Sequence, residues 1–125
     1  MTRRPTRVVL VEDNDVFRET LELLLGLRDE VEVVGSVASG DEAVDLCAEL
    51  EPDVVLVDYR MPGMNGAETT RAVLAAAPAT TVICLTASVA ADEIEELRAA
   101  GAVACITKDQ ELDRLVLAVC EAAAS

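Results

Sequence analysis

Histidine and tryptophan are absent from this sequence, and aromatic residues make up only 2% of its 125 positions. Its four cysteines, Cys47, Cys84, Cys105 and Cys120, form no Cys-x-x-Cys pair. Because the usual ligands of structural zinc are missing at their usual spacings, we expect no zinc site. All four cysteines lie in apolar segments. We therefore expect buried, reduced thiols in a cytoplasmic protein, with a redox-sensing pair as the less favoured alternative.

Positive charge is also scarce, with 10 Lys and Arg against 24 Asp and Glu, for a net charge of −14. Phosphate backbones and anionic membrane surfaces repel such a chain, so we expect it to bind neither nucleic acid nor membrane by itself. The one basic cluster, Arg3, Arg4 and Arg7, precedes an apolar run and has no cleavage-site pattern, which argues against a signal peptide. No apolar run approaches the length of a membrane span.

The rest of the composition is that of a folded domain. Apolar residues make up 52% of the sequence and charged residues 27%, which disfavours disorder. A length of 125 residues corresponds to one domain. We expect a single domain with an aliphatic core over about residues 7–123, and no output domain within these 125 residues.

Short apolar runs alternate with segments of helical periodicity along the whole chain. The runs predict five strands, at residues 7–11, 31–37, 53–57, 81–85 and 102–106. Helices are predicted at residues 14–28, from 39 or 40 up to Pro52, from 65 up to Pro78, and at 92–100 and 111–123. Five such alternations imply parallel strands, right-handed crossovers and helices on both faces of one sheet, a doubly wound α/β fold.

Four of the predicted strands are followed, at once or after one further residue, by polar residues. These residues are Glu12 and Asp13, Asp58, Thr86, and Lys108. In an open parallel sheet, the carboxyl ends of the strands form the edge where ligands bind. We therefore expect three carboxylates, one hydroxyl and one ammonium group to meet at this edge.

The chemistry of this group suits a magnesium ion and phosphoryl transfer. Three carboxylates repel one another, and Lys108 compensates only one of them, so a divalent cation would supply the missing charge. The hard oxygen ligands favour Mg²⁺, with Asp13 and Asp58 as direct ligands and Glu12 holding a metal-bound water. Asp58 is then the candidate nucleophile that forms an acyl phosphate, with Lys108 and Thr86 binding phosphoryl oxygens.

The sequence resembles the receiver domain of two-component response regulators, of the NarL/LuxR type. The matching motifs are Val11-Glu12-Asp13, the stretch from Asp58 through Met61-Pro62 to Gly66, Leu85-Thr86-Ala87, and Thr107-Lys108. The resemblance implies a flavodoxin-like (βα)5 sandwich with strand order 2-1-3-4-5. It also implies that Mg²⁺ is bound by Glu12, Asp13, Asp58 and the backbone carbonyl of Arg60. Asp58 would accept a phosphoryl group from a sensor histidine kinase or from small phosphodonors, with self-catalysed dephosphorylation and no other enzymatic turnover.

The resemblance further implies a switch. Phosphorylation would change the surface of the last helix–strand–helix, which would then pair with a second copy or control an output domain in transcription regulation. The family's switch aromatic falls three residues before the lysine, where this chain has Cys105, and many members have proline where it has Asp109. Lys108-Asp109 resembles the subfamily with a C-terminal helix-turn-helix domain, through which alone we expect DNA contact. Arg60 and Ser88 are expected to flank the path of attacking water.

Each candidate residue also has an alternative, purely structural interpretation. Asp13 could be only a helix N-cap, and Asp58 only a turn residue before Pro62. Thr86 could be an ordinary strand residue, and Lys108 a solvated surface charge. The position of all four at predicted strand ends favours the functional interpretation.

Two other functions compete with a phosphoacceptor. A phosphohydrolase acting through Asp58 would need a second acid or base shortly after its nucleophile, and Arg60 is not one. A receiver-like interaction module that is never phosphorylated is disfavoured by the complete acidic pair and lysine. The absence of an aromatic residue at Cys105 keeps this second alternative open.

Overall fold

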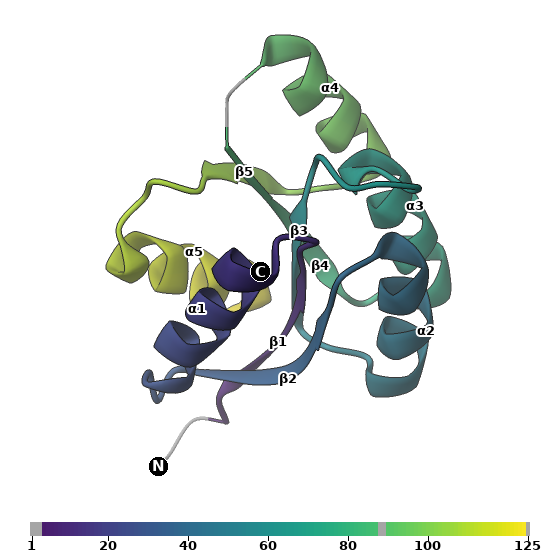
Figure 1. The fold of residues 1–125 in the computed structure, drawn as a ribbon. Helices are drawn as coiled ribbons and strands as arrows, with labels where there is room; N and C mark the ends of the chain where they lie inside the picture. Colours follow the sequence, from purple (N-terminus) through teal and green to yellow (C-terminus); the bar gives the residue numbers. More distant parts are fainter. Residues whose placement is uncertain (1–3, 88–89, 125) are drawn as a thin grey trace.

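The computed structural model describes residues 4–87 and 90–124 (Figure 1). Within these ranges five strands alternate with five helices, as the sequence predicts. The elements are β1 (Thr6–Val11), α1 (Asp15–Gly26), β2 (Val31–Val37), α2 (Gly40–Leu50), β3 (Val54–Asp58), α3 (Gly66–Ala76), β4 (Thr81–Thr86), α4 (Ala91–Ala100), β5 (Ala104–Thr107) and α5 (Leu112–Ala124). No helix in the described part of the chain combines the length and apolar character needed to cross a membrane.

The five strands form one sheet in the order β2-β1-β3-β4-β5, and every neighbouring pair is parallel. This order confirms the flavodoxin-like doubly wound topology. β1 and β3 are neighbours although α1, β2 and α2 separate them in sequence (Figure 1). Successive strands are therefore added to one side of β1 and then to the other, and the switch point between β1 and β3 is where ligands bind in folds of this kind.

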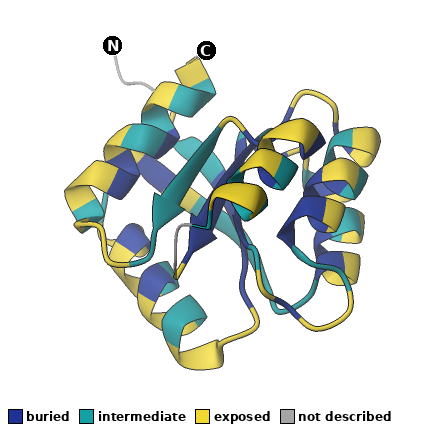
Figure 2. Ribbon diagram, turned by 90° about the horizontal axis from the view of Figure 1, so that it is seen from above, coloured by how far each residue is buried: buried dark blue, intermediate teal, exposed yellow. Residues whose placement is uncertain are grey.

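Two aliphatic clusters fill the space between the sheet and its helices, because side chains of a strand alternate between its faces. Val9, Val11 and Val57 pack with α2, α3 and α4 on one face. Val8 and Leu56 pack with α1 and α5 on the other. Figure 2 shows the inner strands as the most completely buried elements, with exposed residues on the outer sides of the helices. Both faces of β3 are buried along its whole length, which explains its continuous apolar sequence.

Local signals define most helix ends. Asn14 caps α1, and its side chain accepts a hydrogen bond from the Phe17 N–H. Asn65 and Glu68 form a reciprocal capping box at the start of α3. Gly101 ends α4 with a φ of 117°, a left-handed conformation that glycine adopts without steric penalty. The alternative that Asp13 is the cap of α1 is wrong, because Asn14 holds that position.

Some predicted boundaries differ from the structure. The fifth strand begins at Ala104 and not at residue 102, because the N–H groups of Gly101 and Ala102 both bond to the carbonyl of Leu97 at the end of α4. The first helix ends at Gly26 and not at Arg28. The third and fourth strands extend one residue further than predicted and include Asp58 and Thr86. The backbone of both residues is thereby fixed by the sheet and does not belong to a loop.

Candidate functional site

The three carboxylates predicted to meet do so at the carboxyl edge of the sheet. β1 and β3 pair through Val11 and Val57, so the next residues of each strand lie side by side. Glu12, Asp13 and Asp58 each offer one oxygen, and these oxygens all lie within 4.8 Å of one another. Glu12 is 5% and Asp58 7% exposed, whereas Asp13 is exposed. The cluster thus opens to solvent on the side of Asp13.

Lys108, the only lysine in the sequence, faces this cluster from the end of β5. Its ammonium group forms an ion pair with Glu12 and lies 3.5 Å from Oδ2 of Asp58. The Lys108 backbone N–H donates to the carbonyl of Thr86, which fixes the point where the side chain leaves the strand. The side chain is 20% exposed, so the alternative of a solvated surface charge is wrong.

The electrostatics of the site favour an additional cation. Burial raises the pKa of Asp58 to about 6, and the neighbouring Glu12 carboxylate adds to the shift while Lys108 opposes it. Burial also acts to raise the pKa of Glu12, but hydrogen bonds from Lys108 and the Asn14 N–H outweigh it and leave this pKa below its usual value. Three carboxyl groups therefore lie beside one ammonium group. A hard divalent cation fits this oxygen set and this charge.

Thr86 lies at the same edge of the sheet as Asp58. It ends β4, is 5% exposed, and directly follows Leu85, the register partner of Asp58. Thr86 also pairs in register with Thr107, which precedes Lys108. The structure therefore places the hydroxyl-bearing residue on the strand between those of Asp58 and Lys108.

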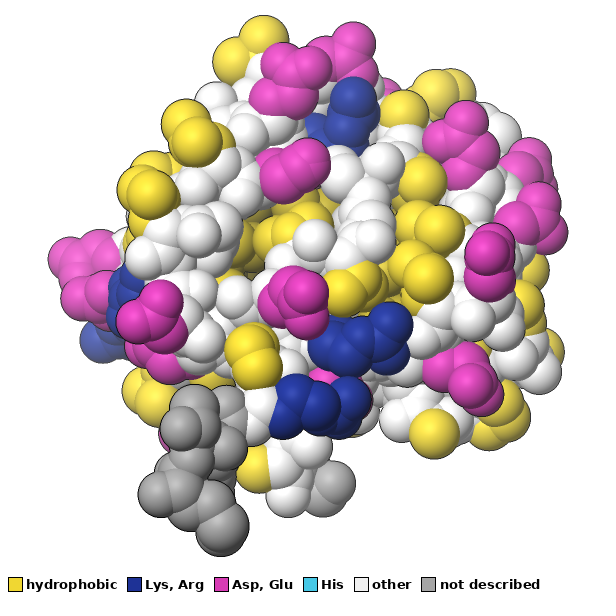
Figure 3. Space-filling model, turned by 90° about the horizontal axis from the view of Figure 1, so that it is seen from below, with side chains coloured by type: hydrophobic (Ala, Val, Ile, Leu, Met, Phe, Trp, Pro, Cys, Tyr) yellow, Lys and Arg dark blue, Asp and Glu magenta, His cyan; other side chains and the backbone are white. Residues whose placement is uncertain are grey.

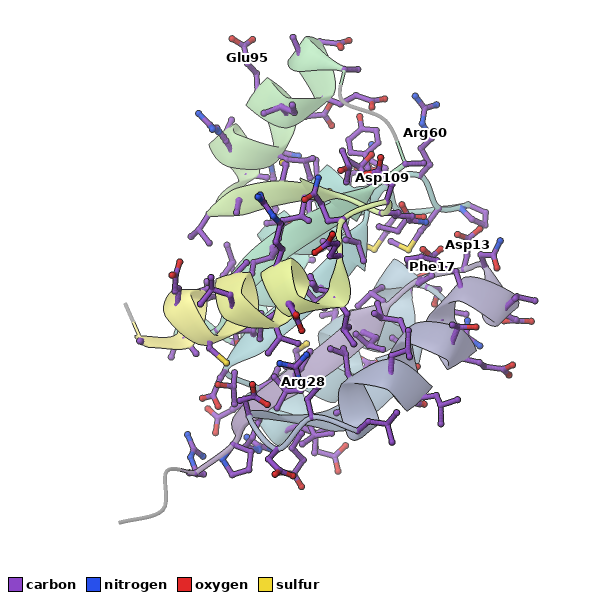
Figure 4. The ribbon with its side chains drawn as sticks, turned by 90° about the vertical axis from the view of Figure 1, so that its left-hand side faces the viewer. Asp13, Phe17, Arg28, Arg60, Glu95 and Asp109 are labelled. Carbon is purple, nitrogen blue, oxygen red and sulfur yellow. The ribbon has the colours of Figure 1, made fainter. Side chains whose placement is uncertain are left out.

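The side chain of Arg60 points away from the carboxylate cluster. Its guanidinium group pairs with Glu93 of α4 at 2.9 Å and is largely exposed (Figure 4). The carbonyl of Arg60 as a magnesium ligand stays a prediction. Two other sequence candidates, Arg3 and Ser88, lie outside the described residues.

Sequence reasoning missed two residues at this site. The ring of Phe17 lies 4.6 Å from the Lys108 ammonium nitrogen, a cation–π contact on the α1 side of the site. Phe17 and Asp13 lie at the same end of the sheet in Figure 4. Tyr59 donates its hydroxyl to Oε2 of Glu96 at 3.0 Å, which ties the residue after Asp58 to α4. In the sequence Phe17 is one of several apolar residues at helical spacing, and the signal for Tyr59 is only its position directly after Asp58.

Comparisons with known proteins agree with this site. The sequence matches the family model of the response regulator receiver domain over residues 8–120. It is 38% identical over 113 residues to the transcriptional regulatory protein LnrK of Bacillus subtilis (strain 168), covering 90% of this chain and 51% of LnrK. The chain spans about half the length of the curated relatives it matches.

Solved structures extend the similarity to the whole fold. The signal receiver domain of a response regulator assigned as NarL from Mycobacterium tuberculosis superposes with a TM-score of 0.93 at 34% identity, covering 98% of this chain and 99% of that one. A two-component response regulator of the LuxR family from Aurantimonas sp. SI85-9A1 gives 0.90 at 30% identity, covering 97% and 86%. With its parallel sheet in the order 2-1-3-4-5 and its acidic cluster facing Lys108, this chain belongs to the response regulator receiver domain family, among regulators of the NarL/LuxR type.

Proposed function

We propose that this receiver domain is a magnesium-dependent phosphoacceptor, in which Asp58 takes a phosphoryl group from a sensor histidine kinase or a small phosphodonor. The observation that carries the proposal is the pairing of a buried Asp58 with two further carboxylate oxygens within 4.8 Å and with Lys108 at 3.5 Å. Receiver domains typically bind Mg²⁺ and are signalling domains, not turnover enzymes. We place the reaction in the cytoplasm.

In this reaction an oxygen of Asp58 attacks the phosphorus atom of the donor, and the bond from phosphorus to the donor's nitrogen or oxygen breaks. The product is an acyl phosphate on Asp58. A bound Mg²⁺ would neutralise phosphoryl charge, and Glu12, Asp13, Asp58 and the Arg60 carbonyl are the residues that would hold it.

The remaining residues of the site act on the phosphoryl oxygens. The Lys108 ammonium group already lies next to both Glu12 and Asp58. It can therefore exchange its contact with a carboxylate for a contact with a phosphoryl oxygen without leaving the site. Thr86, on the intervening strand, would donate its hydroxyl to a second phosphoryl oxygen. Thr86 and Lys108 both lie at the same edge of the sheet as Asp58, which supports their assignment as ligands of the phosphoryl group.

We further propose that phosphorylation changes the surface formed by α4, β5 and α5, which then pairs with a second copy or with a DNA-binding output domain. Support comes from LnrK, a transcriptional regulatory protein about twice as long as this chain. On this proposal the receiver domain occupies about residues 7–123, and contact with DNA is made only by the output domain. Because Cys105 occupies the position of the family's switch aromatic, no aromatic residue on β5 transmits the effect of phosphorylation to this surface.

The decisive test is the intact mass after incubation with acetyl phosphate and Mg²⁺. We expect one phosphoryl adduct in the wild type, no adduct without magnesium, and none in Asp58→Asn. Asp109→Asn is a matched control, because it removes an exposed carboxylate next to Lys108, and it should keep the adduct. A folded wild type that remains unlabelled by acetyl phosphate and by histidine kinases would favour the phosphorylation-independent interaction module.

The switch has its own readout. Phosphorylated and unphosphorylated samples should differ in oligomeric state by size-exclusion chromatography with light scattering, or in amide exchange over α4, β5 and α5. Identical behaviour in both measurements, with the phosphoryl adduct present, would contradict the switch and leave the acceptor reaction intact.

A further inference from the structure

Two cysteines that are 21 positions apart in sequence lie beside each other in the sheet. Cys84 of β4 and Cys105 of β5 are register partners on neighbouring parallel strands. Both side chains pack into the apolar cluster that α2, α3 and α4 cover, so they point to the same face. Each thiol is close enough to perturb the pKa of the other. From sequence alone a redox-sensing pair is only the less favoured alternative, because no Cys-x-x-Cys spacing indicates which of the four cysteines would meet.

The spacing of these residues suits a disulfide. Neighbouring strands lie about 4.8 Å apart, and disulfides span Cα separations of about 4.4–6.8 Å. Bridging Cys84 and Cys105 therefore calls mainly for side-chain rotation. The other two cysteines are placed differently, since Cys47 lies in α2 and Cys120 in α5 against the opposite face of the sheet.

The two thiols differ in their surroundings. Cys84 is fully buried, and burial raises its pKa far above the usual value. Cys105 is half-buried on β5, the edge strand of the sheet. Burial raises the pKa of Cys105 too, but its contact with Cys84 and the charge of Arg98 act in the opposite direction. Cys105 is thus the thiol that an oxidant reaches first, and Cys84 the one that can resolve it.

We propose that Cys84 and Cys105 form a site of reversible oxidation, at which a peroxide converts the two thiols into a disulfide between β4 and β5. In the first step the Cys105 sulfur attacks one peroxide oxygen, the O–O bond breaks, and Cys105 becomes a sulfenic acid, while the other oxygen takes the Cys105 thiol proton and leaves as water, or as an alcohol from an organic peroxide. In the second step the Cys84 sulfur attacks that of Cys105, the S–O bond breaks, and the Cys84 proton leaves with the hydroxyl as water. The two thiols lose two electrons in total, and the peroxide gains them.

The disulfide would lie close to the residues of the phosphoacceptor site. It would join the two strands two residues before Thr86 and three residues before Lys108, close to the ends of β4 and β5. The chemistry does not use Asp58, so the Asp58→Asn variant should still form the bridge. Failure of the phosphoacceptor proposal would therefore leave this one standing, and the reverse also holds.

The test is oxidation of the folded domain with dilute hydrogen peroxide, followed by alkylation of free thiols and tryptic mapping without reductant. Trypsin cuts after Arg98, so Cys84 falls in the peptide 72–98 and Cys105 in 99–108, while Cys47 and Cys120 fall in two others. We expect two of the four thiols to escape alkylation, the peptides 72–98 and 99–108 to appear linked, and dithiothreitol to restore all four thiols.

Four single variants complete the test. Cys105→Ser should abolish the bridge, while Cys120→Ser, at the other half-buried cysteine, should keep it. Cys84→Ala should abolish the bridge and leave a sulfenic acid at Cys105 that dimedone traps. Cys47→Ala, at the other fully buried cysteine of the same cluster, should keep the bridge. Four thiols that stay free under peroxide, a bridge to Cys47 or Cys120, a bridge between two molecules, or oxidation of Cys105 to sulfinic acid without a bridge would each overturn the proposal.

Discussion

At the scale of single residues, Gly66 shows how closely the chain passes itself beside Asp58. A Cβ added at Gly66 would lie 2.6 Å from the Cα of Tyr59 and 2.8 Å from the carbonyl oxygen of Asp58. Both contacts are with backbone, which cannot rotate away. The Gly66 N–H also donates to the Tyr59 carbonyl at 2.7 Å, so the two segments are held together.

Gly66→Ala should therefore push α3 away from the end of β3 and lower the free energy of unfolding by at least about 2 kcal/mol. Gly26→Ala is the matched control, because a Cβ there meets nothing within 4 Å and φ is not positive. That substitution should be neutral or stabilise by up to about 1 kcal/mol. Urea unfolding monitored by circular dichroism measures both, and equal stability of the two variants would contradict this account of Gly66.

The raised pKa of Asp58 predicts how the stability of the metal-free domain depends on pH. Its pKa is about 6 in the folded state, against an ordinary value of 3.8, so the folded state holds this proton more tightly than the unfolded chain does. The contribution to stability is therefore present at low pH and is lost as pH rises from about 4 to about 6, with a slope on the order of 1 kcal/mol per pH unit.

Asp58→Asn removes this titration. At pH 7 the variant should be more stable than the wild type by about 1–3 kcal/mol, and the difference should vanish near pH 4. Urea unfolding of both proteins across this pH range, in the presence of a chelator, gives the comparison. A wild type that is the more stable protein at pH 7, or a difference that does not change with pH, would show that burial does not penalise this carboxylate.

At the scale of elements, the loop after β3 is tied to α4 by two contacts. Tyr59 donates to Glu96, and Arg60 pairs with Glu93 one turn earlier on the same helix. The first contact is partly buried and packs against the apolar cluster, whereas Arg60 is 68% exposed. This link offers a route from the residue after Asp58 to α4 that does not need an aromatic residue on β5.

Tyr59→Phe keeps the ring and removes only the hydrogen bond, so we expect a loss of about 1 kcal/mol, concentrated in α4. Amide exchange of residues 91–100 should become faster in this variant. Arg60→Ala should have a smaller effect, because an exposed ion pair contributes between about 0 and 1 kcal/mol. Unchanged exchange of α4 in Tyr59→Phe would rule out this coupling.

The elements themselves were largely predictable from sequence, for a local reason. The apolar runs and the helical periodicity each depend on neighbouring residues, and capping residues such as Asn65 act within one turn. The start of β5 was not predictable in this way. The first two residues expected in this strand, Ala102 and Val103, are apolar. The Ala102 N–H, however, bonds to the carbonyl of Leu97 at the end of α4, and Val103 is 60% exposed.

At the scale of the whole molecule, the charge of −14 is a source of self-repulsion. Figure 3 shows acidic side chains scattered over the face at the amino ends of the strands, with basic ones in a few places. Arg4 pairs there with Asp53, and Arg28 with Glu30 and Asp113. Any salt will screen this surface, so a specific effect of magnesium must be measured at constant ionic strength.

Under that condition Mg²⁺ should stabilise the domain, because the carboxylate cluster exists only in the folded state. The expected gain is about 1.4 kcal/mol at a magnesium concentration ten times the Kd. Thermal unfolding with MgCl2 against NaCl of equal ionic strength measures it. Asp13→Asn removes the exposed carboxylate of the cluster and should reduce the gain, while an equal gain in this variant would place the binding of magnesium elsewhere.

The sequence by itself determined the α/β alternation, the polar residues at four of the five strand ends, and the kind of chemistry these residues favour. All three are properties of short segments and of their order along the chain. Tertiary structure decided which side chains meet. Lys108 pairs with Glu12 across 96 positions, Tyr59 with Glu96 across 37, and Cys84 lies beside Cys105 across two strands. These contacts follow from strand order and register, which arise when the helices bury their apolar faces on the sheet, and no local pattern in the sequence encodes them.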